Sequence, residues 1–245
     1  MDAPSITIDL RIPGQWSHPK ELVQQLPAGC HLTGEALILP DGTQVAFGAV
    51  RADDQFAGIF RSSCRQPLTE EELAAVDGYR VNVFLSGPGG SMPAARTMMQ
   101  AGAAVVRAGG LGVFIDNSTL AHGGRQWLDM AEDGSPEALS FAFVALVGGR
   151  TDVWTMGMHV LGLRDIVMKR ADLEADGLDI IDVIRYLCAA DKPVEDGHLL
   201  ADLSGLRFQA FTEPAPVPGG RVGSPVHNPF GRLRLVSMRD IAETN

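Results

Sequence analysis

The sequence predicts an α+β protein with a mixed, largely antiparallel sheet and helices packed on one face. Residues 79–116 have the pattern of strand, glycine loop, helix, glycine turn and strand, and a second strand–helix–strand unit follows at about 164–212. Asp41 and Gly42 stand between two apolar runs, which indicates a hairpin and therefore antiparallel neighbours. Two such units are typical of ferredoxin-like split βαβ repeats. A parallel doubly wound sheet is the alternative, and the hairpin disfavours it.

The segment before residue 79 is expected to form short elements. Residues 5–12 alternate apolar and polar side chains, as a half-buried strand does, and Ser17 is placed to cap a short helix. Residues 37–47 form the hairpin, and a short helix is expected at residues 56–60. Residues 69–72 have the spacing of a capping box, which starts another helix.

The unit at residues 79–116 is the best defined in the chain. Alternating β-formers over residues 79–85 predict a buried strand. The glycine-rich residues 86–91 cannot continue that strand and predict a tight loop. Ser91 is placed to cap a helix over residues 92–108, and residues 111–115 form a short apolar strand.

Five further elements are expected after this unit. A helix is expected around residues 127–131, and residues 139–147 are rich in β-formers and predict a core strand. Residues 161–168 predict another strand. Residues 180–188 carry apolar side chains at helical spacing, which indicates an amphipathic helix. Residues 206–211 are expected to form a closing strand.

These elements predict a single domain over residues 1–212. It comprises a hairpin part at residues 1–78 and two βα units at residues 79–212. Residues 213–245 are expected to be a Pro/Gly-rich C-terminal extension, with a short final strand near residue 235.

The composition excludes several classes of function. The formal net charge of −10 disfavours a nucleic-acid binder, because affinity for phosphates depends on clustered lysines and arginines. No apolar run approaches the ~20 residues of a membrane span, and no signal peptide is recognised at the N-terminus. Three separated cysteines indicate reduced thiols and a cytoplasmic protein. The expected partner is another protein, with no nucleic acid and no membrane, and a homo-oligomer remains open.

The glycine loop is the best candidate for a ligand site. Amides of Gly87, Gly89 and Gly90, with Ser91 at the helix start, could hold an anion, because unpaired N–H groups and the helix dipole favour negative charge. The loop lacks the lysine of a P-loop, and Met92 stands where GxGxxG requires its third glycine. A tight turn that allows close packing is the alternative interpretation.

The histidines give two weak candidates for acid–base catalysis. His122 follows a strand end and is expected in a surface loop, whereas His159 is expected to be partly buried and hydrogen-bonded. No two of the six histidines stand at HxxxH or HxH spacing, so no metal site and no cofactor are predicted.

Residues 87–91 also resemble the oxyanion-forming turn of Clp-type serine peptidases, in which backbone amides face a developing negative charge. In that family a nucleophilic serine with small neighbours follows some distance later, and a histidine lies further on. Ser118 and His122 have other surroundings and stand too close together, so no peptidase is inferred.

Thr155, Gly157, Gly162 and Asp165 carry a second resemblance. This motif is similar to the signature of a bacterial family known only as a domain of unknown function, in which T-x-G-[LM] is followed by a glycine and then by an acidic residue that opens a strand. The order of elements over residues 5–212 is similar too, while the tail beyond Glu213 departs from it. The resemblance implies no catalytic residues. Physically, the two glycines indicate turns around a buried Thr155, with Asp165 hydrogen-bonded to the turn.

These observations lead to two hypotheses of different kinds. The first is a non-catalytic binding or interaction module, since no complete catalytic constellation is present. The second is an enzyme or small-anion binder that uses residues 86–91, with His122 or His159 as acid or base. The second requires the loop and a histidine to share a pocket, because acid–base catalysis needs hydrogen-bond reach.

Overall fold

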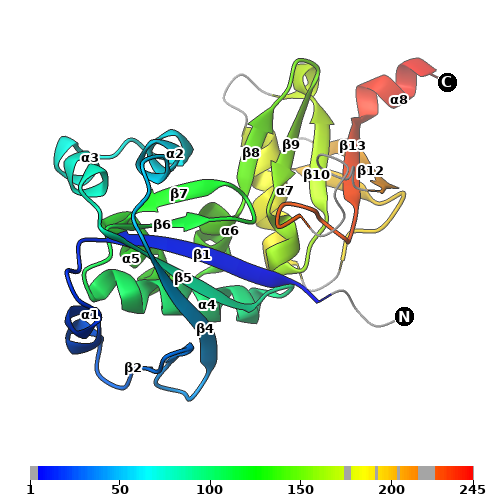
Figure 1. Cartoon of the computed structure of the whole chain (residues 1–245). Helices are drawn as coiled ribbons and strands as arrows, with labels where there is room; N and C mark the ends of the chain where they lie inside the picture. Colours follow the sequence, from blue (N-terminus) through cyan, green and yellow to red (C-terminus); the bar gives the residue numbers. More distant parts are fainter. Residues whose placement is uncertain (1–4, 174–177, 191–192, 203–204, 215–223, 245) are drawn as a thin grey trace.

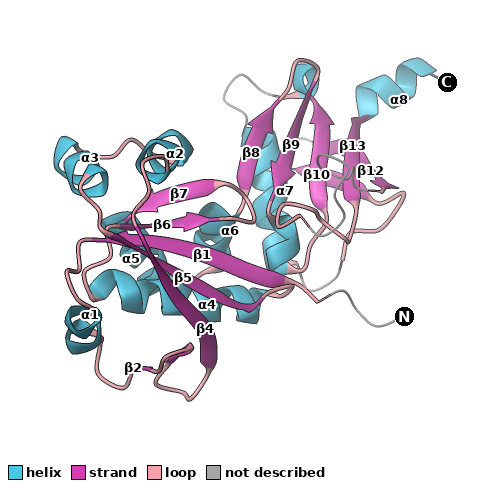
Figure 2. Cartoon of the chain, in the orientation of Figure 1, coloured by secondary structure: helices cyan, strands magenta, loops and turns pink. Residues whose placement is uncertain are grey.

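The chain is an α+β protein with two sheets. The computed structural model describes residues 5–173, 178–190, 193–202, 205–214 and 224–244. These residues form eight α-helices, an antiparallel sheet of seven strands (sheet A) and a mixed sheet of six strands (sheet B). Figures 1 and 2 show the two sheets side by side. The expectation of one sheet is therefore wrong. No helix within the described ranges is long and apolar enough to cross a membrane.

Sheet A contains the N-terminal strand, the hairpin and most of the central unit. Its strands, in spatial order, are β2 (His31–Leu32), β3 (Ala36–Ile38), β4 (Gln44–Arg51), β5 (Val81–Pro88), β1 (Thr7–Gly14), β6 (Gly112–Ile115) and β7 (Leu120–Gly123). The hairpin predicted at residues 37–47 is confirmed as the antiparallel pair β3–β4.

The central unit is a split β-α-β arrangement. Strand β1 pairs antiparallel with both β5 and β6, so β5 and β6 run parallel with β1 between them. Helix α4 (Met92–Arg107) connects them, with Ser91 as its N-cap and Gly109 at φ 102° just beyond its end. The predicted strand, helix and strand are confirmed. Strand β5 extends to Pro88, however, so part of the predicted loop belongs to the strand.

Sheet B contains the second unit. Its spatial order is β11 (Leu199–Asp202), β12 (Gly205–Glu213), β13 (Arg232–Ser237), β10 (Asp165–Lys169), β9 (Asp152–Met156) and β8 (Ala145–Gly148). Only β10 and β13 pair in parallel. Strand β13, which follows the Pro/Gly-rich residues, lies inside this sheet and is the final strand predicted near residue 235. Helix α7 (Leu178–Ala189), also predicted, connects β10 to β11.

The remaining helices surround the sheets on more than one face. They are α1 (Pro19–Gln25), α2 (Phe56–Ser63), α3 (Glu70–Asp77), α5 (Gly124–Asp133), α6 (Pro136–Phe143) and α8 (Met238–Thr244), with 3₁₀ turns η1 (Met158–Leu161) and η2 (Arg170–Asp172). The predicted capping box of α3 is confirmed. Helix α1 is capped by His18 and not by Ser17, because the His18 ring accepts from the Lys20 amide.

Alternate residues of β6 pack into different clusters. Val113 and Ile115 join α4 in a large buried cluster, whereas Phe114 joins Phe56 and Phe60 of α2 in a smaller one. Successive strand side chains point to opposite faces, so helices cover both faces of sheet A. The expectation that helices lie on one face is wrong.

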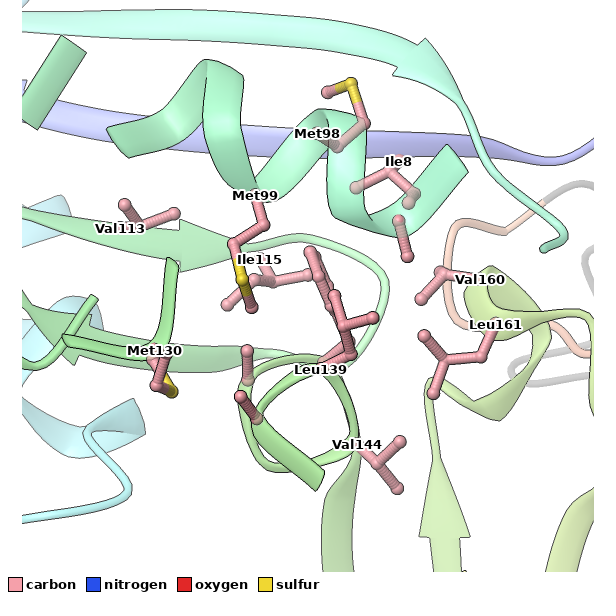
Figure 3. Packing of buried hydrophobic residues seen from close by; sticks show 14 of the residues in the cluster. Ile8, Met98, Met99, Val113, Ile115, Met130, Leu139, Val144, Val160 and Leu161 are labelled. Atoms are coloured by element: carbon pink, nitrogen blue, oxygen red, sulfur yellow. The ribbon is translucent and has the colours of Figure 1, made fainter. Parts of the chain in front are cut away.

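The large cluster continues from sheet A into sheet B. It includes Ile8 of β1, Leu139 of α6, Val160 of η1 and Leu235 of β13. Figure 3 shows Val160 and Leu161 of η1 among side chains of α4, β1 and α6. The turn η1 is therefore a buried link between the two sheets.

The predicted core strand at residues 139–147 is wrong. Its first part is helix α6, and only residues 145–148 form a strand, β8. The Ser135 hydroxyl accepts from the Ala138 amide at 3.1 Å, and Pro136 occupies the first helical position. A serine cap and a proline at the helix start stabilise this short helix despite its aromatic content.

Candidate functional site

Two amides of the glycine loop donate to carbonyls of the protein itself. The Gly89 amide donates to the Ile6 carbonyl at 2.9 Å, and the Gly90 amide donates to the Val160 carbonyl at 2.9 Å. The Ser91 hydroxyl accepts from the Ala94 amide at 3.3 Å. The loop thereby fastens the start of α4 to η1, and these two glycine N–H groups do not point into a cavity.

Close packing explains why glycines stand in this loop. A Cβ atom on Gly87 would lie 2.5 Å from Sδ of Met98, and one on Gly89 would lie 2.9 Å from Cγ1 of Ile8. On the other side, a Cβ on Gly162 would lie 2.5 Å from the Gly90 carbonyl oxygen. The space beside the loop is therefore filled by neighbouring side chains and backbone.

His122 lies in the interior, and its predicted surface position is wrong. It is fully buried in β7. Its Nε2 lies 2.9 Å from the Ala142 carbonyl and its Nδ1 lies 3.2 Å from Oε1 of Gln126. Burial lowers the pKa of His122 to about 4, so the ring is neutral at pH 7. These contacts hold α6 against β7 and leave the ring no access to a substrate.

His159 is buried and hydrogen-bonded, as predicted. Its Nε2 lies 2.9 Å from the Pro225 carbonyl, and burial lowers its pKa to about 4. Nδ1 of His159 has no hydrogen-bond partner among the described residues. The loop at residues 86–91 and the turn that carries His159 are in contact, through the Gly90–Val160 hydrogen bond, whereas the ring itself bonds to Pro225.

A polar cluster surrounds Pro225 at the junction of the sheets. Asn117, in the turn between β6 and β7, donates from Nδ2 to the carbonyls of Thr7 at 2.9 Å and of Pro225 at 3.2 Å. The Pro225 carbonyl therefore faces both Asn117 and His159. Ser118, next in the chain, is fully buried, and its Oγ has no hydrogen-bond partner among the described residues.

The Thr155–Asp165 motif forms a closed hydrogen-bond network. The Thr155 hydroxyl donates to Oδ1 of Asp165 at 3.2 Å and accepts from the Ile166 amide at 2.7 Å, while the Met158 amide donates to the same carboxylate at 3.3 Å. Gly157 and Gly162 flank η1 at φ 103° and 83°. The predicted turn around a buried threonine is confirmed. Burial raises the pKa of Asp165 to about 6.

A further cleft lies between α7 and the edge of sheet B, next to two exposed apolar side chains. Tyr186 of α7 is 57% exposed and Leu199 of β11 is 48% exposed, the highest values among the exposed large hydrophobic residues of these elements. Both line a cleft of about 330 Å³. Its lining also includes the apolar Val183, Leu200, Ala201 and Phe208 and the charged Asp182 and Arg207. We call it the α7–β11 groove. Sequence reasoning missed it, although an aromatic residue away from the apolar stripe of α7 was a signal.

Arg164 lines two further clefts. They have volumes of about 340 and 440 Å³ and share Arg164 and Phe230 in their linings. The guanidinium donates to the carbonyls of Phe230 at 3.1 Å and Val194 at 3.2 Å, and it contacts the Glu195 carboxylate at 3.3 Å. Arg164 is therefore committed to holding two segments of the chain together.

Comparison with protein-family models, with curated proteins and with solved structures finds no match to this chain. The described residues contain no group of three or more His, Cys, Asp or Glu side chains arranged to hold a metal ion. By its fold and its main cleft, the chain is therefore an α+β protein with an open, largely apolar groove beside a sheet edge.

Proposed function

We propose that this protein is a non-catalytic binding module that holds a segment of another protein in the α7–β11 groove. The observation that carries this proposal is the groove itself, in which the exposed Tyr186 and Leu199 border a cleft of about 330 Å³. Aromatic side chains beside an apolar pocket are the usual centres of binding energy in protein interfaces. The net charge of −10 favours a partner segment that is not acidic.

The contacts of the candidate catalytic groups support binding over catalysis. His122 and His159 are buried and bonded to backbone carbonyls. An acid or base must reach the reacting atoms of a substrate, and neither ring lines one of the clefts described above. Ser118 is buried as well, so the peptidase-like constellation has no support.

The alternative is a small-anion binder that uses residues 86–91. It has less support, because Gly89 and Gly90 already donate to the Ile6 and Val160 carbonyls. A thermal-shift screen with nucleotides, phosphosugars, acyl-CoA compounds and divalent metals tests it, since a ligand of the folded state raises the melting temperature. A shift that Ser91→Ala abolishes would favour this alternative.

The proposal also covers the fold type, the family and the cellular location of the protein. We expect the two βα units to be ferredoxin-like, and the parallel β5 and β6 around β1 give support for the first unit. The chain is a member of the bacterial domain-of-unknown-function family that carries the Thr155–Asp165 motif. It works in the cytoplasm, for which its three unpaired cysteines give support.

Peptide selection tests the proposed function. Random linear peptides displayed on phage are selected against the wild-type protein, and the affinity of the best peptide is then measured by fluorescence anisotropy. We expect Tyr186→Ala to weaken binding about tenfold or more, as truncation of a central aromatic does. The matched control is Leu146→Ala, which truncates an exposed leucine on β8 at the opposite edge of sheet B and should leave the affinity unchanged. Selection of no peptide, or equal effects of the two variants, would reject the groove as the site.

A further inference from the structure

Strand β11 is an edge strand of sheet B. Its one neighbour in that sheet, within the described residues, is β12. It has four residues, and the register shifts between Leu200 and Ala201. Edge strands present backbone groups that can pair with a further chain.

The backbone at Leu199 points its donor away from β12. The His198 carbonyl accepts from the Ala210 amide at 2.8 Å, so it faces inward. In a trans peptide unit the C=O and the N–H point in opposite directions, and the Leu199 N–H therefore faces outward. The alternation of an antiparallel ladder directs the Leu199 carbonyl outward as well.

Helix α7 places apolar side chains beside this edge. Val183 and Tyr186 of α7 line the same cleft as Leu199 and Leu200 of β11, and the charged Asp182 and Arg207 line it as well. Leu200 is opposite Phe208 in the sheet. A chain lying along β11 would thus meet outward-facing backbone groups and a largely apolar cleft together.

Building on the proposed function, we infer that the groove binds its partner by β-strand addition. A short extended peptide lies along β11, its carbonyl accepts from the Leu199 N–H, and its apolar side chain enters the cleft. Main-chain hydrogen bonds supply affinity and alternate side chains supply specificity in this binding mode.

The net charge of the chain and the shape of the edge favour a foreign peptide over a second copy of the chain. Each copy carries a formal charge of −10, which opposes self-association. Because β11 has four residues and an irregular register, it offers only a short stretch to a partner strand. An uncharged or basic peptide of a few residues matches both properties.

The test removes the Leu199 N–H donor and leaves strand β11 in place. Leu199→Pro deletes the outward N–H, and proline is tolerated at the first residue of an edge strand. Leu199→Ala keeps the N–H and removes the side chain, so it is the matched control. With the peptide selected on the wild-type protein, we expect Leu199→Pro to bind about tenfold more weakly than Leu199→Ala, as loss of one backbone hydrogen bond implies.

A second measurement covers the case in which Leu199→Pro does not fold. The selected peptide is N-methylated one residue at a time, and strand addition predicts that affinity falls at alternate residues. Equal affinities of the two Leu199 variants, or losses without alternation, would overturn strand addition and leave the proposed function standing. Selection of no peptide would reject both strand addition and the proposed function. A wild-type dimer that Leu199→Pro dissociates in light scattering would identify a second copy as the occupant and overturn the inference.

Discussion

Thr119 has a backbone conformation that threonine rarely adopts. Its φ is 54°, and it is the only non-glycine residue with a positive φ among the described residues. This left-handed conformation costs a non-glycine residue about 1–2 kcal/mol, whereas glycine adds roughly 0.5–1 kcal/mol of chain entropy. Because Thr119 is exposed, we expect Thr119→Gly to raise the free energy of unfolding by about 1 kcal/mol. Urea denaturation measures it. Thr151→Gly, at an exposed position without positive φ, should not stabilise, and a lower midpoint for Thr119→Gly would contradict the account.

The buried histidines make stability depend on pH. In the folded protein His122 and His159 have pKa values of about 4, against 6.5 for an ordinary histidine. As the pH falls below 6.5, the unfolded chain takes up protons that the folded protein does not accept until about pH 4. Each histidine therefore lowers the free energy of unfolding by roughly 3 kcal/mol over this range. The effect is absent above pH 7.

Asp165 opposes this effect. Its folded pKa of about 6 lies above the ordinary value of 3.8, so between these values the folded protein holds the extra proton and stability rises as the pH falls. Burial also raises the pKa values of Asp116 and Asp172, which act in the same direction as Asp165. Because the two histidines have the opposite and larger combined effect, we expect stability to fall between pH 7 and pH 4. Denaturant midpoints across this range measure it. Asp165→Asn should make the fall steeper, and a stability that increases on acidification would refute the assignment.

At the scale of elements, η1 holds the glycine loop through close backbone contact. Gly162 has φ 83°, and a Cβ there would lie 2.5 Å from the Gly90 carbonyl oxygen. We expect Gly162→Ala to lower the free energy of unfolding by about 2–3 kcal/mol, through backbone strain and displacement of the loop. Gly48→Ala in β4 is the control, since a Cβ there meets nothing within 4 Å. It should be neutral or stabilising by about 0.5–1 kcal/mol. Equal effects of the two substitutions in thermal denaturation would show that the contact carries no stability.

The sequence predicts elements well where local signals agree. The central unit, the hairpin, the capping box of α3 and the apolar stripe of α7 each combine periodicity with turn or cap chemistry. Helix α6 was predicted as a strand because Phe141, Phe143 and Val144 favour strands, and only the cap at Ser135 and Pro136 reveals the helix. The sequence predicts His122 at the surface because it follows a strand end among glycines, where a loop is expected, whereas the structure places it in strand β7. Its burial depends on α6 covering it, which is a tertiary effect.

At the scale of the whole molecule, the division into two sheets could not be predicted from local patterns. The alternation of apolar residues in a strand shows that one face of the strand is buried, but it does not show which sheet the strand joins. The buried cluster runs from β1 through η1 to β13, and these segments are far apart in the chain. The Thr155–Asp165 motif was predicted as a structural turn, and the network around η1 confirms this interpretation at the junction of the sheets.

The groove is also a property of the whole molecule. Tyr186 and Leu199 belong to a helix and a strand that line one cleft, because β11 lies at the end of sheet B. Sequence analysis favoured the glycine loop because glycines before a helix often bind anions. It could not show that the Ile6 and Val160 carbonyls already accept from that loop.

The most direct test of the account is amide hydrogen exchange of the full chain with and without the selected peptide. If the peptide adds as a strand, the Leu199 amide changes from outward-facing and unpaired to hydrogen-bonded, and its exchange slows together with that of neighbouring α7 residues. Amides of the glycine loop should be unchanged, because Gly89 and Gly90 are already paired. Protection at residues 86–91 with none at β11 would contradict the account and would move the binding site to the glycine loop.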